Sequence, residues 1–188
     1  LSIGVQRMAA RRAIVRHLAA VETLGSATVI ASDKTGTLTR NEMSVRRIVT
    51  ATGSATFDGI GYSPEGHVEP SLSDPAPAAL RSEVVRALAA AERANNAVLQ
   101  DHDGRWMIQG DPTEGALIVA ARRAGLEADI LDARFPRVGE VPFSSERKLM
   151  STVHHDTDRG GGLRAFTKGA PDVLLAHCSH ELVGDGTR

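Results

Sequence analysis

One heptapeptide of this 188-residue chain combines the residue types that phosphoryl transfer requires. It is Asp33-Lys34-Thr35-Gly36-Thr37-Leu38-Thr39, and it follows residues 27–31, a short apolar and β-branched run that predicts a buried strand. A carboxylate at the carboxyl end of such a strand lies where open α/β sheets bind ligands, and aspartate can form an aspartyl-phosphate. Gly36 allows a tight turn beside a phosphate, and Lys34 offsets its charge. A purely structural alternative is that Asp33 caps a helix after the strand.

The heptapeptide resembles, at all seven positions, the phosphorylation motif of the P-type ATPases. This resemblance implies that Asp33 accepts the γ-phosphoryl group of ATP, with Lys34 as its catalytic neighbour. It also implies that the Asp33 carboxylate and the Thr35 backbone carbonyl hold Mg²⁺, which places Thr35 beside the nucleotide as well.

A second segment, Gly110-Asp111-Pro112-Thr113-Glu114, carries a helix-start signal. Pro112 suits the first helical turn and Asp111 suits the cap, so a helix is predicted through Ala121. The segment also resembles a motif of the nucleotide-binding domain of the same family, which implies that Glu114 hydrogen-bonds the adenine amino group. The structural alternative is that Glu114 is an acidic residue that stabilises the first turn of the helix.

Two later segments resemble motifs that line the ATP pocket of the family. Residues 143–150 imply that Phe143 stacks on adenine and that Lys148 lies near the pocket and the phosphates. Lys168-Gly169-Ala170-Pro171 implies that Lys168 lines the bottom of the pocket, with Gly169 beside it. The structural alternatives are a core phenylalanine and a surface lysine.

One position in the adenine segment departs from the family pattern. Many calcium pumps carry an arginine that reaches the phosphates where this chain has Ser145. The difference predicts weaker ATP binding or a different use of Arg147.

The N-terminal segment reads as a basic helix over residues 3–22. By charge pattern alone its arginines form a solvated face. Residues 6–25 nevertheless resemble the connector between the fourth transmembrane helix and the phosphorylation site, as found in the calcium-pump-related branch.

The remaining elements follow from hydrophobic periodicity and turn signals. Residues 53–77 are expected to be turns with one short strand. Further strands are predicted over residues 45–51, 97–100, 105–109, 138–143, 149–155 and 163–167, and Pro142 predicts a strand edge or a bend. Further helices are predicted over residues 78–94, 126–133 and 171–176. The first of these helices carries a core-facing stripe, Leu80, Val84, Leu88 and Ala91, and is expected to end at Asn95-Asn96.

The fold class that these elements and the resemblance imply is α+β, with mixed helix and strand. Residues 41–188 are expected to form a truncated nucleotide-binding domain, with a mainly antiparallel sheet flanked by helices. Residues 1–40 are expected to be the membrane connector and the start of a HAD-like phosphorylation domain, including its first strand. That strand lacks its domain partners within the chain, so we expect its packing to be non-native or borrowed from a neighbouring molecule.

Composition narrows the function classes. The net charge of −1 does not suggest a nucleic-acid-binding protein, and the single Cys178 cannot form an intrachain disulfide. No stretch approaches the roughly 20 apolar residues of a membrane helix. The His154-His155 pair and residues 177–180 supply too few ligands for a metal centre.

The sequence is therefore interpreted as a cytoplasmic, ATP-binding fragment of a cation-transporting P-type ATPase of the plasma (inner) membrane. The resemblance of the connector and of residues 110–114 favours calcium as the transported ion, with sodium, magnesium and protons as the alternatives. The expected cofactors are ATP and Mg²⁺. The expected partners are the transported cation, held in membrane helices outside this chain, and the transmembrane, actuator and remaining phosphorylation domains of the same polypeptide. The fragment alone is expected to bind nucleotide weakly and not to turn over ATP.

Two alternatives belong to other classes. A HAD-superfamily phosphatase with an aspartyl nucleophile usually carries a second aspartate where this chain has Thr35. A non-catalytic nucleotide-binding module has no need of the nucleophile Asp33.

Overall fold

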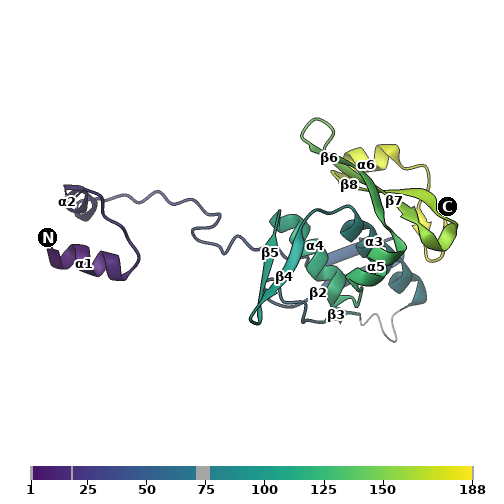
Figure 1. Cartoon of the computed structure of the whole chain (residues 1–188), viewed down its shortest axis with the longest axis horizontal. Helices are drawn as coiled ribbons and strands as arrows, with labels where there is room; N and C mark the ends of the chain where they lie inside the picture. The colour runs from purple at the N-terminus through teal and green to yellow at the C-terminus, as the bar shows by residue number, and fades with distance from the viewer. Residues whose placement is uncertain (1, 18, 71–76, 188) are drawn as a thin grey trace. The chain divides into compact units, whose positions relative to one another are not determined.

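The computed structural model describes residues 2–17, 19–70 and 77–187. The chain divides into two compact units, Leu1–Arg40 and Asn41–Arg188, and Figure 1 shows the elements of each.

Unit 1 contains two short helices, α1 (Ser2–Ala10) and α2 (Ala19–Gly25). The prediction of one helix over residues 3–22 is therefore wrong. Arg12 adopts a φ of 64°, a left-handed conformation that a continuous right-handed helix cannot contain, and residue 18 lies outside the described residues.

The strand predicted over residues 27–31 is not formed. Val29 and Ile30 are 82% and 88% exposed. A strand is stabilised by hydrogen bonds to neighbouring strands, and the described part of unit 1 contains no other strand with which this run could pair. The apolar pattern thus predicts a strand that this unit cannot complete by itself.

The strands of unit 2 pair in antiparallel fashion throughout its described residues, as predicted. β1 (Arg47–Thr50), β2 (Gly53–Phe57) and β3 (Val68–Glu69) form one sheet, and β4 (Val98–His102) pairs with β5 (Arg105–Gln109). A second three-stranded sheet has the order β6-β7-β8 and consists of Arg137–Ser144, Leu149–Asp156 and Gly162–Gly169. A last hairpin joins β9 (Leu182–Val183) to β10 (Gly186–Thr187).

Two details of this strand pattern differ from the sequence expectation. The strands are divided among four small sheets in the described residues, where one sheet was expected. Residues 53–70 contribute both β2 and β3, where one short strand was predicted, while residues 71–76 of that segment lie outside the described residues.

The helices of unit 2 are α3 (Ala78–Arg93), α4 (Pro112–Arg123), α5 (Ala128–Arg134) and α6 (Pro171–His177), with a 3₁₀ turn, η1, at Thr157–Arg159. All four α-helices were predicted, and the ends of each lie within a few residues of the predicted ends. In Figure 1, α6 lies beside the β6-β7-β8 sheet, and the β4–β5 hairpin lies beside α4.

The core of unit 2 lies where α3, α4 and β2 meet. Three of the four stripe residues on α3, Leu80, Val84 and Leu88, are between 0% and 4% exposed, as the helical spacing predicts, and the fourth, Ala91, is half-buried. The three buried residues pack against residues from β2, α4 and the segment after α4, namely Ala55, Phe57, Ala120, Ala121 and Leu126. This core holds α4, whose first turn faces the candidate site.

A buried carboxylate links three segments around α3. Glu83 is 3% exposed and accepts hydrogen bonds from the backbone N–H groups of Gly184 and Thr52, at 2.6 and 3.0 Å. Hydrogen bonds from Gly184 first, and then from Thr50 and Thr52, outweigh the opposing effect of burial and lower the pKa of Glu83 to about 2. The C-terminal hairpin is thereby tied to α3.

No helix in the described ranges is both long enough and apolar enough to cross a membrane.

Candidate functional site

A hollow of about 600 Å³ lies in unit 2 at the first turn of α4. It is lined by residues from three elements that are far apart in the sequence, namely Asp111, Thr113, Glu114, Leu117, Phe143, Lys168 and Gly169. The hollow falls within the size range of small-molecule sites, which combine apolar walls with a few fixed polar groups.

The segment directly before α4 contributes Asp111 to the lining of the hollow. Gly110 has a φ of +121°, and a Cβ there would lie 2.9 Å from the Cα of Ala97. Asp111 caps the helix, since its Oδ1 accepts from the N–H groups of Thr113 and Glu114 at 2.8 and 3.1 Å, which confirms the predicted cap. Together, Gly110, the cap residue Asp111 and the first-turn Pro112 set the direction in which α4 begins.

The carboxylate of Glu114 is held by donors from two other elements. Its Oε1 lies 2.7 Å from Nζ of Lys168 on β8, in an ion pair whose side chains are 14% and 25% exposed. Its Oε2 accepts from the backbone N–H of Asn96 at 3.0 Å. Glu114 and Lys168 are 54 residues apart in the sequence, and the fold brings them into direct contact.

The Asp111 carboxyl group belongs to the same charged cluster. Desolvation alone would raise its pKa, but the hydrogen bonds from Glu114 and Thr113 and the charge of Lys168 outweigh it, so the pKa is lowered from its usual value. The Asp111 carboxylate therefore lies in the lining of the hollow together with the Glu114–Lys168 pair.

Phe143 forms an apolar wall. It lies on β6, an edge strand whose register shifts between Val141 and Ser144, and Pro142 falls inside that irregular stretch. A bend or edge was predicted there from the proline, and the structure confirms it. Phe143 is 61% exposed, so it is not the core phenylalanine of the structural alternative.

Gly169 lets the end of β8 approach the β6–β7 turn. A Cβ at this position would lie 2.1 Å from the carbonyl oxygen of Lys148 and 2.9 Å from the Cα of Leu149, distances that no side chain can occupy. Ala170 N–H donates to the same Lys148 oxygen at 3.0 Å. The glycine thus fixes the position of Lys168, its neighbour in the chain.

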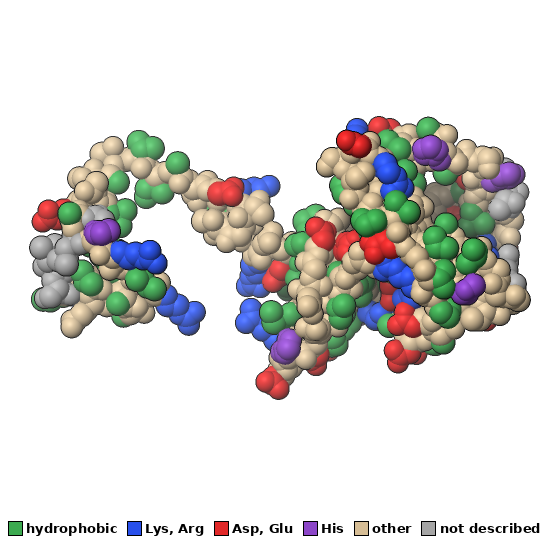
Figure 2. Space-filling model, turned by 45° about the horizontal axis from the view of Figure 1, so that its top comes forward, with side chains coloured by type: hydrophobic (Ala, Val, Ile, Leu, Met, Phe, Trp, Pro, Cys, Tyr) green, Lys and Arg blue, Asp and Glu red, His purple; other side chains and the backbone are tan. Residues whose placement is uncertain are grey.

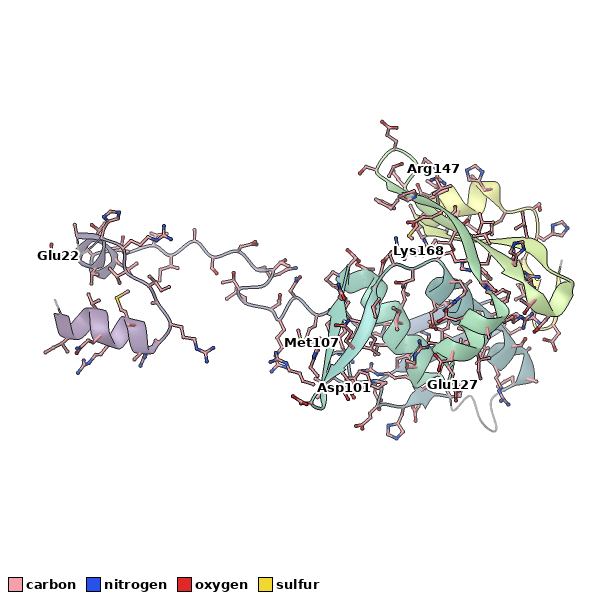
Figure 3. All side chains as sticks on the ribbon, viewed as in Figure 1. Glu22, Asp101, Met107, Glu127, Arg147 and Lys168 are labelled. Carbon is pink, nitrogen blue, oxygen red and sulfur yellow. The ribbon has the colours of Figure 1, made fainter. Side chains whose placement is uncertain are left out.

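Lys148 does not line the hollow, although its segment borders it. The residue is exposed, has a φ of 53°, and completes the β6–β7 turn through a 2.7 Å hydrogen bond from its N–H to the Ser144 oxygen. Ser145 and Arg147 are exposed in the same turn. Figure 3 shows Arg147 at this turn and Lys168 apart from it, near α4.

The heptapeptide 33–39 lies in unit 1 and forms a tight turn. Gly36 has a φ of 74°, as its predicted role requires, and the N–H groups of Leu38 and Thr39 donate to the Lys34 oxygen at 3.0 and 3.2 Å. Asp33, Lys34 and Thr35 are all exposed. No described residue of unit 1 is buried, so these side chains are not enclosed by their own unit.

The described residues contain no group of three or more His, Cys, Asp or Glu side chains that could hold a metal ion. His154 is instead 1% exposed and bonded on both ring nitrogens, to the Phe135 oxygen at 2.8 Å and to Thr152 Oγ1 at 3.0 Å. Burial first, and then the nearby charges of Arg93 and Arg137, lower its pKa.

Sequence reasoning missed several residues of this site. Thr113 and Leu117 line the hollow, and their position on the first turns of α4, one helical turn apart, was the available signal. Asn95 and Asn96 were interpreted only as the end of α3, yet both contact Glu114. No local pattern indicates those contacts, because they depend on how α3 and α4 pack.

A mixed fold with antiparallel sheets thus carries a hollow in which a carboxylate and an ammonium group lie beside an exposed aromatic ring. The family model described as "P-type ATPase, cytoplasmic domain N" matches residues 83–188, more than half of the chain. The chain therefore belongs to the P-type ATPase family, in its cytoplasmic N domain. This membership favours the P-type ATPase interpretation over the two alternatives.

Named relatives agree with this assignment. The chain is 44% identical over 186 residues to a "Probable cation-transporting ATPase F" of Mycobacterium tuberculosis, covering 99% of the chain and 20% of the relative. It is 39% identical to a "Calcium-transporting ATPase" of Bacillus subtilis over 95% of the chain and 20% of the relative, and 41% identical to "Calcium-transporting ATPase type 2C member 1" of Bos taurus over 95% and 18%. The chain thus spans about a fifth of the length of these relatives.

Proposed function

We propose that residues 41–188 bind ATP in the hollow at the first turn of α4, as the nucleotide-binding domain of a cation-transporting ATPase. The observation that carries the proposal is the convergence of Glu114, Phe143 and Lys168 on one hollow from α4, β6 and β8. An aromatic face, an acceptor and a fixed cation are the groups that a purine base and its attached phosphates require.

The exposed ring of Phe143 provides the stacking surface for adenine. A ring that is 61% exposed contributes little to the core of the unit. Stacking of a base on an aromatic side chain is worth about 1–3 kcal/mol.

Glu114 supplies the specificity for adenine. An ionised carboxylate accepts hydrogen bonds and donates none, so it favours the 6-amino group of adenine and disfavours a 6-oxo group. Its two oxygens offer about four acceptor sites, of which Lys168 and Asn96 occupy two. About two acceptor sites therefore remain, and one of them can accept from the base.

Lys168 has two tasks. Its ammonium group keeps Glu114 oriented through the 2.7 Å ion pair, and because Lys168 lines the hollow, the remaining donors of the ammonium group are available to the nucleotide. Gly169 places Lys168, while Lys148 lies at the turn beside the hollow, where its exposed ammonium group meets the phosphates.

In the whole protein, Asp33 is the phosphoryl acceptor. Its carboxylate oxygen attacks the γ-phosphorus, the bond to the β-phosphate oxygen breaks, and ADP leaves, with Lys34 offsetting charge. The Asp33 carboxylate and the Thr35 carbonyl are oxygen donors of the kind that Mg²⁺ prefers, and would hold it together with water. When bound there, Mg²⁺ would supply positive charge for the transferring phosphoryl group.

The proposed setting is the cytoplasmic side of the plasma (inner) membrane, with the transported cation bound in membrane helices of the same polypeptide. Calcium is the proposed cation, because two of the relatives named above carry calcium transport in their names. Formation and loss of the aspartyl-phosphate would bias those helices between two states.

The test is a calorimetric titration of the chain with ATP, with and without Mg²⁺. Phe143→Ala should weaken binding by about 5- to 150-fold, the equivalent of the stacking energy. Leu175→Ala is the matched control, because Leu175 is an exposed apolar residue, at 71%, that does not line the hollow. Absence of saturable binding at millimolar ATP, or equal losses in both variants, would contradict the proposal.

We also propose that the chain alone does not turn over ATP, because its exposed Asp33 turn is not surrounded by a catalytic site in its own unit. Steady ATP hydrolysis by the purified chain that disappears in Asp33→Asn would overturn this second proposal.

A further inference from the structure

The loop between α3 and β4 lies directly behind the Glu114 carboxylate. Asn95 is 7% exposed, and its Nδ2 donates to the backbone oxygen of Glu114 at 2.9 Å, while its Oδ1 accepts from the N–H of Ala97 at 2.8 Å. The next residue, Asn96, donates its backbone N–H to Glu114 Oε2 at 3.0 Å. One short loop thus contacts both the backbone and the side chain of Glu114.

A second set of contacts anchors this loop from the side of β6. Arg137 donates to the backbone oxygen of Asn95 at 3.1 Å and to Asn96 Oδ1 at 2.8 Å. Asn96 Nδ2 in turn donates to Glu140 Oε1 at 2.8 Å. Arg137 and Glu140 are themselves paired at 2.7 Å. The loop is therefore held between α4 and β6, and the buried side-chain amide of Asn95 bonds it to the backbone of α4.

We infer that Asn95 is a positioning residue for adenine recognition, which acts through Glu114; this inference rests on the proposed function of the hollow. A glutamate side chain has several rotamers, and only an orientation that aims a free lone pair at the base distinguishes an amino group from an oxo group. Asn95 fixes the loop that presents the Asn96 N–H, and that N–H together with Lys168 defines the plane of the carboxylate.

The position of the contacts explains why a side chain outside the hollow affects specificity. Asn95 does not line the hollow, so its loss removes no contact with the nucleotide. When the amide is removed, the loop loses its hydrogen bond to the backbone of α4, and the Asn96 N–H, which is the remaining bond from the loop to Glu114, moves relative to Oε2. Only the ion pair with Lys168 then orients the Glu114 carboxylate, which no longer presents an acceptor in a defined direction to the base.

The experiment compares the dissociation constants of ATP and inosine triphosphate, which carries a 6-oxo group, for the whole chain and its variants. The unmodified chain should prefer ATP by about tenfold or more, since a hydrogen bond to a charged group is lost with inosine. Glu114→Gln should abolish the preference and thereby tests the proposed function by itself. Asn95→Ala should reduce the preference to less than about threefold while inosine triphosphate binding stays within about twofold.

Two further variants separate positioning from general destabilisation. Asn95→Asp keeps an acceptor for Ala97 but replaces the donor to Glu114 with a carboxylate oxygen and adds a negative charge, so it should lose at least as much of the preference as Asn95→Ala and serves as a second, independent variant. Asn96→Ala removes the side-chain contacts with Arg137 and Glu140 but keeps the backbone N–H, the Asn95 amide and the Arg137 bond to the Asn95 backbone oxygen, so it should retain the preference for ATP. Thermal unfolding of each variant confirms that it is folded at the temperature of the titration.

The outcomes distinguish the two claims. If the unmodified chain does not bind ATP, or Glu114→Gln retains the preference, the proposed function of Glu114 fails. If those two controls behave as expected, the inference on Asn95 is overturned by any of three results: a preserved preference in Asn95→Ala and Asn95→Asp, equal weakening of both nucleotides, or an equal loss of preference in Asn96→Ala.

Discussion

The turn that follows Asp33 and the turn that precedes Glu114 both combine carboxylates with small residues and a glycine of positive φ. In unit 2, the turn is built against Ala97, capped by Asp111, and connected to Lys168 on a distant strand. In unit 1, the hydrogen bonds of the turn stay within residues 32–39, and every side chain of the heptapeptide is exposed.

The difference shows that a motif and a site are separate things. A motif gives the chemistry of the residues, whereas a site also needs elements that hold them at fixed distances. Figure 2 shows charged side chains of both signs lying among apolar ones on the visible face of unit 2. The contacts of Glu114 with Lys168 and Asn96 show how one such charge is held in place. Unit 1 has no buried described residue that could fix its charges in this way.

The largest expected difference between the two units is in amide hydrogen exchange. Amides in the middle of α3 should exchange at least about 10³-fold more slowly than those of residues 27–31, because a folded core opens only at a cost of about 5 kcal/mol or more. The measurement is exchange followed by NMR or mass spectrometry. Comparable protection of residues 27–31 and α3 would show that unit 1 is packed in solution.

Core truncation should separate the units by a few kcal/mol. Leu88→Ala should lower the free energy of unfolding by about 2–5 kcal/mol, because Leu88 is 1% exposed at the centre of the core. Ile30→Ala, at a position that is 88% exposed, should change it by less than about 0.5 kcal/mol. Chemical denaturation measures both, and a similar loss in the two variants would contradict the comparison.

The next effect concerns a glycine in each unit. Gly169→Ala should destabilise unit 2 by about 1–3 kcal/mol, because the new Cβ collides with the backbone of Lys148 and Leu149. Gly4→Ala is the matched control, since nothing lies within 4 Å of a Cβ there. Thermal unfolding gives both values, and an unchanged midpoint for Gly169→Ala would show that the β7–β8 contact is looser than described.

The smallest effect is the pH dependence due to a single carboxyl group. The pKa of Glu83 is about 2 in the folded chain against an ordinary value of 4.5, so its contribution to stability is fully present above about pH 4.5 and is lost as the pH falls toward 2. Glu83→Gln should therefore flatten the dependence of the unfolding free energy on pH in this window. Parallel curves for the two proteins, measured by denaturation between pH 6 and pH 2.5, would contradict the assignment.

Local rules explain which parts of this fold could be predicted from the sequence. The cap at Asp111 and the stripe Leu80, Val84 and Leu88 depend on residues within two or three turns of one helix, and both were predicted correctly. The strand at residues 27–31 was predicted wrongly because a strand also depends on its neighbours, which no local pattern supplies. The same reason explains the missed division of unit 2 into four small sheets.

The candidate site shows the same division. The resemblance to a known family predicted roles for Glu114, Phe143 and Lys168, and the structure places these three residues around one hollow. The same resemblance predicted a role for Lys148, whose side chain does not line that hollow. The contacts of Asn95 and Asn96 with Glu114 could not be predicted from spacing, since they form between the end of one helix and the start of another.

The most direct test of the central claim, that the nucleotide site is assembled within unit 2, is an NMR titration of the isotopically labelled chain with ATP. We predict saturable shifts of the backbone resonances of residues 111–117, 143 and 168–169, with no change at residues 33–39. Shifts concentrated at residues 33–39, or resonances that do not respond to millimolar ATP, would contradict the account.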